Sequence, residues 1–165
     1  MSTFENQDIN NTTLVASLRS RLGKTLPGKP VRLAYLYGST SEGRQTSLSD
    51  IDIGLILDPE SAKQMSGYQR LILESDIGLA LERYCKLENT DIRVVNDAPI
   101  MLQGQMVQRG LILYARDDDI RVDYEVYTLM KYLDFLPIAE SFQREYFQRR
   151  KRELQVLHER KNIND

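Results

Sequence analysis

Four short apolar runs along the chain have the length and boundaries that are typical of β-strands. They cover residues 31–37, 51–57, 90–95 and 111–114. In the second run polar and apolar residues alternate at its start, which predicts a strand with one face in the core. We therefore expect four strands, and the fourth is the shortest.

Between these runs, apolar residues recur every three or four positions, which is the spacing of an amphipathic helix. One predicted helix begins near Thr12, after a polar stretch that we expect to be frayed. A second spans about residues 66–86, and a third covers residues 99–110 between a proline and a glycine. Alternating strands and helices predict an α/β core over residues 1–116.

The remaining residues, 117–165, have a helical pattern throughout. Pro137 removes a backbone donor and clashes with the preceding turn, so we expect it to separate two helices. These would run from Asp119 to about Leu136 and from Ile138 to about Lys161. The prediction is a helical pair that extends the same domain.

The composition is that of a soluble globular protein and excludes several kinds of site. In 165 residues, 41% are hydrophobic and 28% charged, and no apolar run approaches the length of a membrane span. The N-terminus lacks the pattern of a secretion signal, so we expect no membrane association and a cytoplasmic location. Cys85 is the single cysteine and His158 the single histidine, so an internal disulfide and the common zinc motifs lack residues.

Charge is nearly balanced overall but unevenly distributed along the chain. The net charge is −2, which does not indicate direct nucleic-acid binding. Residues 117–125 are acidic, whereas residues 144–161 are basic. Runs of this kind are most often solvated helix faces, although they can also form a contact surface.

The clearest chemical signal is the segment Tyr37–Leu57, in which Asp50 and Asp52 begin the second strand. Side chains alternate on a strand, so these two carboxylates share one face, and Ile51 and its apolar partners share the other. Carboxylates held this close repel each other unless a divalent cation lies between them. Oxygen ligands favour Mg²⁺ or Mn²⁺.

Gly38 and Ser39 end the first strand and form a small, polar turn. Glycine permits backbone torsions and close approach that a Cβ forbids, so backbone N–H groups and the Ser39 hydroxyl could bind phosphates. An isolated Gly-Ser pair is usually an ordinary turn, and the carboxylates downstream favour the functional interpretation here. The other common phosphate motifs, GxxxxGK[ST] and GxGxxG, do not occur in the chain.

Gly38 and Ser39, followed after ten residues by Asp50 and Asp52, resemble the GS-x10-DxD signature of polymerase-beta-like nucleotidyltransferases. In so short a chain the motif is similar to that of the minimal nucleotidyltransferases, including MntA-type antitoxins paired with HEPN toxins. The resemblance implies a polymerase-beta-like core, a small mixed sheet with flanking helices, plus a C-terminal helical segment. It also implies two Mg²⁺ ions with ATP as substrate.

The resemblance further implies a third acidic residue on the strand beside Asp52. Asp91, at the head of the third strand, matches that position, and Asp97 is the alternative. Asp50, Asp52 and Asp91 are thus the predicted catalytic and metal-binding residues, while Gly38, Ser39 and Arg44 are predicted to bind nucleotide. Arg44 lies in the connector, where a solvated role is equally compatible with the sequence.

By resemblance, the expected reaction transfers AMP from ATP to a tyrosine of a HEPN-type toxin protein, which neutralises it. The C-terminal helical segment would bind this partner, with Arg149–Arg152 contributing electrostatic steering. Arg152 and His158 resemble the R-x4-6-H core of HEPN ribonucleases, but the surrounding segment is too short for that helical bundle.

Two other functions remain open at this point. One is a small-molecule, aminoglycoside-type nucleotidyltransferase, although such enzymes usually carry a larger substrate domain. The other is an antitoxin that only binds its partner. The complete set of Gly38, Ser39, Asp50 and Asp52 argues against pure binding, because a binding module has no use for converging carboxylates.

Overall fold

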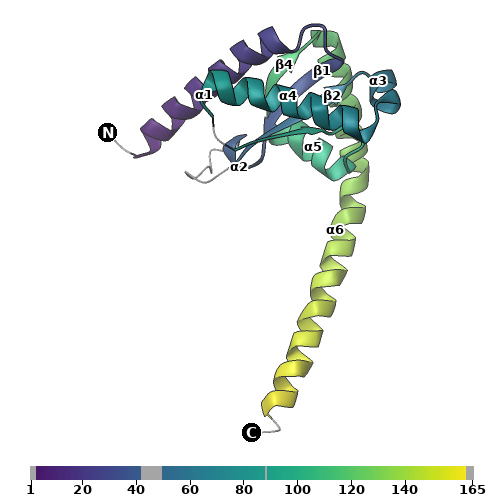
Figure 1. The fold of residues 1–165 in the computed structure, drawn as a ribbon. Coiled ribbons are helices and arrows are strands. Elements are labelled where there is room, and N and C mark those ends of the chain that lie inside the picture. Colours follow the sequence, from purple (N-terminus) through teal and green to yellow (C-terminus); the bar gives the residue numbers. More distant parts are fainter. Residues whose placement is uncertain (1–2, 42–49, 88, 163–165) are drawn as a thin grey trace.

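The computed structural model describes the backbone of residues 3–41, 50–87 and 89–162, and the side chains of residues 12–41, 50–87 and 89–154. Helices and strands alternate along most of the chain, and a single long helix ends it (Figure 1). In chain order the elements are α1 (Thr3–Thr25), β1 (Val31–Tyr37), α2 (Gly38–Ser41), β2 (Ile51–Leu57), α3 (Pro59–Gln64), α4 (Gly67–Cys85), β3 (Thr90–Val94), α5 (Ile100–Arg109), β4 (Leu111–Ala115) and α6 (Asp118–Asn162).

The strands form one mixed sheet with the order β3-β2-β1-β4. The β1 strand is antiparallel to both β2 and β4, whereas β2 and β3 are parallel. Asp52 pairs in register with Tyr37 of β1 and with Asp91 of β3. The four predicted strands are confirmed, and so is the mixed α/β architecture.

Helices cover both faces of the sheet (Figure 1). On one face α1 and α4 pack on a large core that includes Ile51, Ile53 and Leu55 of β2. On the other face α5 and the first part of α6 enclose a smaller core around Tyr35, Ile56 and Met106. The predicted alternation of β2 is therefore confirmed, and the face that carries Asp52 is the face of α5 and α6.

Local signals explain where two of the helices begin and end. Ser66 caps α4, because its side chain accepts from the Gln69 N–H and the Gln69 side chain accepts from the Ser66 N–H. The helix ends at Lys86 in the left-handed conformation, with φ 53°. Pro99 and Gly110 flank α5. Both helices match their predictions to within one residue.

The α1 helix begins nine residues earlier than predicted, at Thr3 instead of near Thr12. Apolar periodicity reports the part of a helix that packs on a core, and in α1 that part includes Val15, Leu18 and Leu22. The polar residues before it continue the helix without any such signal. The one-turn helix α2 and the short helix α3 were also not predicted, since neither is long enough to show a period.

The predicted helical pair at the C-terminus is wrong, because α6 is one helix of 45 residues with Pro137 inside it. Proline removes the bond that its N–H would donate to Leu133 and crowds that carbonyl. Both residues are exposed, so water can bond to the Leu133 carbonyl and the helix continues. In Figure 1 the distal part of α6 extends away from the sheet and its covering helices.

Much of the α6 surface is apolar and exposed. Tyr132 and Thr128 are buried against the body, whereas other large apolar side chains along the helix lie in solvent. The exposed set comprises Val122, Val126, Tyr127, Met130, Leu133, Phe135, Ile138, Phe142, Tyr146, Phe147 and Leu154. None of the helices in the described ranges has the combination of length and apolar character that crossing a membrane requires.

Candidate active site

Gly38 joins β1 to α2 in a conformation that only glycine adopts easily, with φ 74°. A Cβ at this position would overlap the Asp52 carboxylate. The backbone of the predicted phosphate turn therefore lies directly against the central carboxylate. Glycine is required here both by its backbone torsion and by the space.

Thr40 ties the turn to the carboxylate strand and was not identified from the sequence. Its side chain is fully buried, and its hydroxyl donates to the Asp50 carbonyl over 3.2 Å. Ser41 closes the turn, because its hydroxyl donates to the Gly38 carbonyl over 2.9 Å. The signal in the sequence was a run of hydroxyl residues after Gly38, which suits a tight, self-bonded turn.

Asp91 lies beside Asp52 on the neighbouring strand and on the same face of the sheet. The two residues are paired across β2 and β3, while Ile92 points into the large core on the opposite face. Burial raises the pKa of Asp52, and the nearby charges of Asp91 and Asp50 raise it further. The structure thus places Asp91 beside Asp52, and Asp50 is near enough for its charge to act on Asp52.

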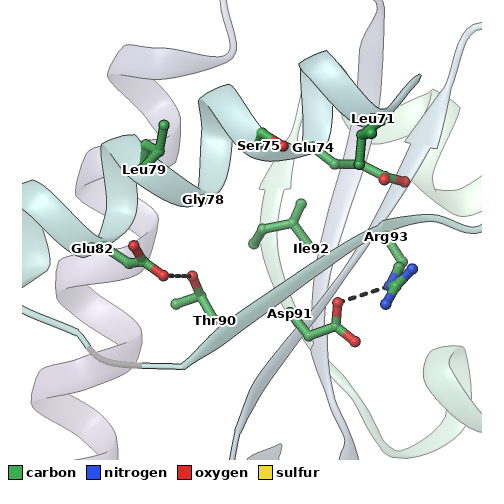
Figure 2. Close-up of a pocket in the computed structure, with 10 residues that line it drawn as sticks. All are labelled: Leu71, Glu74, Ser75, Gly78, Leu79, Glu82, Thr90, Asp91, Ile92 and Arg93. Atoms are coloured by element: carbon green, nitrogen blue, oxygen red, sulfur yellow. Dashed lines mark hydrogen bonds and ion pairs between the residues drawn. The ribbon is translucent and has the colours of Figure 1, made fainter. Parts of the chain in front are cut away.

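Arg93 forms an ion pair with Asp91, with 2.7 Å between its Nε and Asp91 Oδ1 (Figure 2). The two residues are two apart on β3, so their side chains leave the strand on the same face. Sequence reasoning missed Arg93, although its spacing from Asp91 was visible. It places a cation against Asp91.

Tyr37 is the other site residue that the sequence analysis missed. It is half-buried, it packs at the edge of the smaller core, and it pairs with Asp52 across β1 and β2. Burial raises the pKa of its hydroxyl, and the negative charges of Asp52 and Asp91 raise it further. Its position immediately before Gly38 could have indicated that it borders the site.

The remaining predicted residues lie in different places. Ser39 is partly exposed in α2, next to Gly38. Arg44 lies outside the described residues. Asp97 follows the far end of β3 and pairs with Arg70, with 2.6 Å between Asp97 Oδ2 and Arg70 Nη1. Because Asp97 is at the opposite end of the strand from Asp91, the alternative assignment loses its geometric support.

A groove of about 440 Å³ opens beside Asp91, between α4 and the outer edge of β3 (Figure 2). Its α4 wall carries Glu74 and Glu82 together with apolar side chains, and its β3 wall ends at Asp91 and Arg93. The residues that line it are Leu71, Glu74, Ser75, Gly78, Leu79, Glu82, Thr90, Asp91, Ile92 and Arg93.

Comparison with protein-family models matches residues 21–119 to the family described as polymerase beta, nucleotidyltransferase. The chain belongs to this nucleotidyltransferase family. The matched range includes β1, the Gly38 turn, β2 and β3, so the family assignment covers every described element of the site. No curated protein matches the chain.

Solved structures with the same fold include chains from toxin–antitoxin complexes. One, crystallised with AMP-PNP, is 24% identical, with a TM-score of 0.60 over 78% of this chain and 98% of that chain. A second, the MntA-HepT toxin–antitoxin, is 20% identical, with a TM-score of 0.55 over 79% and 97%. A third, a tri-AMPylated Shewanella oneidensis HEPN toxin in complex with MNT antitoxin, is 21% identical, with a TM-score of 0.51 over 86% and 98%. At these identities the likeness establishes the fold.

The nucleotidyltransferase fold implies a divalent metal, and the chemistry of the donor set fits one. The candidate ligands are all carboxylate oxygens, which suit Mg²⁺. Burial, and then repulsion from Asp91 and Asp50, raise the pKa of Asp52, and a bound cation would offset both effects. As the side chains stand, no three histidine, cysteine, aspartate or glutamate side chains among the described residues form a group that could hold a metal. Asp91 is turned toward Arg93, so assembling the site requires a side-chain change there.

Proposed function

We propose that this protein transfers AMP from ATP to a hydroxyl, and that the hydroxyl belongs to a tyrosine of a HEPN-type toxin, which the modification neutralises. The observation that carries the proposal is the convergence of the Gly38 turn on Asp52, with Asp91 paired beside it. A phosphate-binding turn in direct contact with a carboxylate cluster suits phosphoryl or nucleotidyl transfer. The family assignment agrees with that class of reaction.

In this mechanism, Asp50 and Asp52 would hold Mg²⁺, and Asp91 would complete the ligand set. When bound, Mg²⁺ would neutralise the charge that develops on the phosphates. The acceptor oxygen forms a bond to the α-phosphorus while the bond to pyrophosphate breaks. We also assign Asp91 as the group that receives the acceptor's proton, once its side chain has left the ion pair with Arg93.

The turn supplies the other half of the site. Gly38 lets the backbone come close to the nucleotide, and the Ser39 hydroxyl donates to a phosphate oxygen. We assign Arg44, in the connector, the role of neutralising the charge of the leaving pyrophosphate. Ser41 stays bonded to the Gly38 carbonyl and keeps the turn closed.

The choice of a toxin as acceptor is supported by the structural relatives. One relative is a complex crystallised with AMP-PNP, and another contains a tri-AMPylated HEPN toxin with its antitoxin. The exposed apolar residues of α6, among them Phe142 and Tyr146, offer a surface for a protein partner. Pure binding without catalysis is disfavoured by the three carboxylates, whose repulsion only a catalytic or metal role explains.

The deciding experiment incubates the protein with α-labelled ATP and Mg²⁺, alone and with the protein encoded beside it, and locates the label by intact-mass spectrometry. The mass of one or more AMP units on the partner supports the proposal. Label that appears only on an aminoglycoside or another small molecule would replace it with the small-molecule alternative. A partner that is bound tightly and never labelled would indicate the binding-only function.

Nucleotide binding has an independent test in thermal unfolding. A ligand at a hundredfold excess over its Kd stabilises the folded state by about 2.7 kcal/mol, so ATP should raise Tm and Mg²⁺ should increase the shift. Ser39→Ala should reduce that shift without changing the Tm of the free protein. No shift at millimolar Mg-ATP would contradict the nucleotide assignment.

A further inference from the structure

The groove between α4 and β3 borders Asp91, one of the candidate catalytic residues. It opens beside Asp91, on the side of this carboxylate away from Asp52, because β3 is the outermost strand of the sheet. Figure 2 shows Thr90 and Ile92 directed toward α4, whereas Asp91 and Arg93 are directed to the other side of β3, at the edge of the groove. An acceptor that reached Asp91 from the groove would not have to pass the position near Gly38 where the nucleotide is proposed to bind.

The β3 strand presents backbone groups to this groove. The Asn89 carbonyl and the Val95 N–H bond to β2, so in a parallel pair the alternate residues, Thr90, Ile92 and Val94, direct their N–H and C=O groups outward. Glu74 accepts from the Val94 N–H over 2.7 Å, which agrees with this direction and occupies that donor, so an added segment would pair with Thr90 and Ile92. An extended polypeptide segment could use such an edge by adding as a further strand.

The side chains of the groove favour a particular kind of segment. Glu74, Glu82 and Asp91 are acidic, and Arg93 is the single basic residue that lines the groove. Leu71 and Leu79 are more than half exposed on the α4 wall, where the aliphatic part of a lysine or arginine side chain can pack against them. Side chains alternate along an extended segment, so a tyrosine between two such basic residues points to the opposite side, where Asp91 lies.

We propose that this groove binds the acceptor as an extended polypeptide segment whose tyrosine is flanked by lysine or arginine. The inference rests on the proposed function and adds to it the sequence context of the modified tyrosine. The segment lies along β3, its basic residues face Glu82 and Glu74, and its tyrosine hydroxyl reaches Asp91. The nucleotide occupies the other side of Asp91, near Gly38.

The test uses the full chain, Mg-ATP and two synthetic peptides, each with one tyrosine, flanked in one by lysines and in the other by glutamates. The wild-type protein should label the lysine peptide with a kcat/KM at least about tenfold higher at low salt, and the preference should fade as salt rises. Ser75→Trp, which fills the groove from an exposed position on α4, should raise KM for the lysine peptide about tenfold or more and leave KM for ATP unchanged. Asp76→Trp is the matched control, because Asp76 is exposed on the same helix and does not line the groove.

Charge is tested separately with Glu82→Gln, which removes a negative charge but can still accept from the Thr90 hydroxyl, now 3.0 Å away. It should raise KM for the lysine peptide about threefold at low salt, whereas Asp76→Asn, which removes one charge from the same helix, should not. Unchanged kinetics in both Ser75→Trp and Glu82→Gln would overturn the groove assignment. The groove assignment would also be overturned if the protein labels its partner but neither peptide, or if it labels only a polycationic small molecule. If the wild-type protein labels nothing at all, the proposed function itself fails.

Discussion

The body of the protein and the distal part of α6 differ in how their apolar residues are used. In the body, strands β1 and β2 are almost entirely buried between two layers of helices. In α6, every described residue from Glu140 to Leu154 is exposed, including Phe142, Tyr146 and Leu154. The apolar residues of β1 and β2 are explained by contacts within the chain, whereas those of distal α6 are not. Their presence indicates a contact that this chain alone does not make.

The beginning of α6 belongs to the body. Tyr35 donates to Glu125 over 2.8 Å, and Arg121 holds the other Glu125 oxygen over 2.8 Å. Burial raises the pKa of Tyr35, and the bond to Glu125 raises it further, so the hydroxyl stays protonated and continues to donate. Tyr124 also packs near Tyr35, and burial raises its pKa to about 12. The boundary between the two regions therefore lies within one continuous helix.

The largest effect is expected on AMP transfer when the two carboxylates at the start of β2 are removed. Asp50→Asn combined with Asp52→Asn should reduce AMP transfer by at least about a thousandfold, the scale of losing a principal electrostatic contribution. Folding should not suffer. The pKa of Asp52 is raised in the folded protein, so its contribution to metal-free stability is present at low pH and is lost as pH rises through the folded pKa. Removing the carboxylate should therefore leave Tm at pH 7 unchanged or higher.

Asp97→Asn is the control for this double variant. It removes an aspartate from the far end of β3, where Asp97 pairs with Arg70, and should leave transfer unchanged. Both variants are compared by label incorporation from α-labelled ATP and by thermal unfolding. Wild-type transfer by the double variant would refute the carboxylate assignment.

The second prediction concerns a truncated protein that lacks distal α6. Deleting residues 141–165 should change the free energy of unfolding by less than about 0.5 kcal/mol, because the described part of this segment is exposed throughout. The Tm shift with Mg-ATP should persist, whereas AMP transfer to the partner should fall about a hundredfold through loss of a second contact. A full rate of transfer to the partner would show that distal α6 does not bind it.

The third prediction tests the attachment of α6 to the body. A Cβ on Gly104 of α5 would collide with the Tyr132 ring of α6, so Gly104→Ala should lower the free energy of unfolding by about 1–3 kcal/mol. Gly23→Ala is the matched control, since a Cβ there meets nothing within 4 Å in α1 and should stabilise the helix by up to about 1 kcal/mol. Denaturant unfolding measures both. Equal effects of the two substitutions would contradict the close packing of α5 and α6.

The smallest expected effect concerns the basic part of distal α6. Reversing Arg149, Arg150 and Arg152 to glutamate should slow association with the partner severalfold at low salt, and the difference should fade as ionic strength rises. The expected size is limited, because Arg149 and Arg150 both pair with Glu153, at 3.5 and 3.2 Å. Stopped-flow association rates across a salt series provide the measurement. A salt-independent difference would indicate a direct contact instead of steering.

Most of the sheet and the position of the carboxylates could be predicted from the sequence, because both depend on local alternation. The pattern of β2 placed Asp52 opposite the core, and the family resemblance nominated Asp91, which lies beside it as expected. Tyr37 was missed because its role depends on which strands are neighbours, whereas Arg93 was missed although it lies two residues from Asp91 on the same strand. Thr40 was missed because a buried hydroxyl in a tight turn has no periodic signal.

The wrong prediction of a helix break at Pro137 has a different origin. The rule that proline ends a helix assumes that the carbonyl left unbonded is costly, which holds in a packed interior. On the exposed helix α6 that cost is small, since Leu133 is accessible to water. Sequence reasoning could not know that residues 140–154 lie exposed, and the start of α1 was misjudged because the sequence before Thr12 shows no apolar periodicity.

The length of α6 has a consequence for how the protein would meet a partner. The helix continues from Pro137 to Asn162, a rise of about 38 Å at 1.5 Å per residue, compared with a radius of gyration of about 13 Å for a body of this size. A partner bound to distal α6 would remain attached while its tyrosine leaves the groove between α4 and β3 and binds there again. Tethering of this kind creates effective concentrations in the millimolar range. Successive AMP units could then be added during a single encounter, and the rate of each addition would be independent of how dilute the partner is in solution.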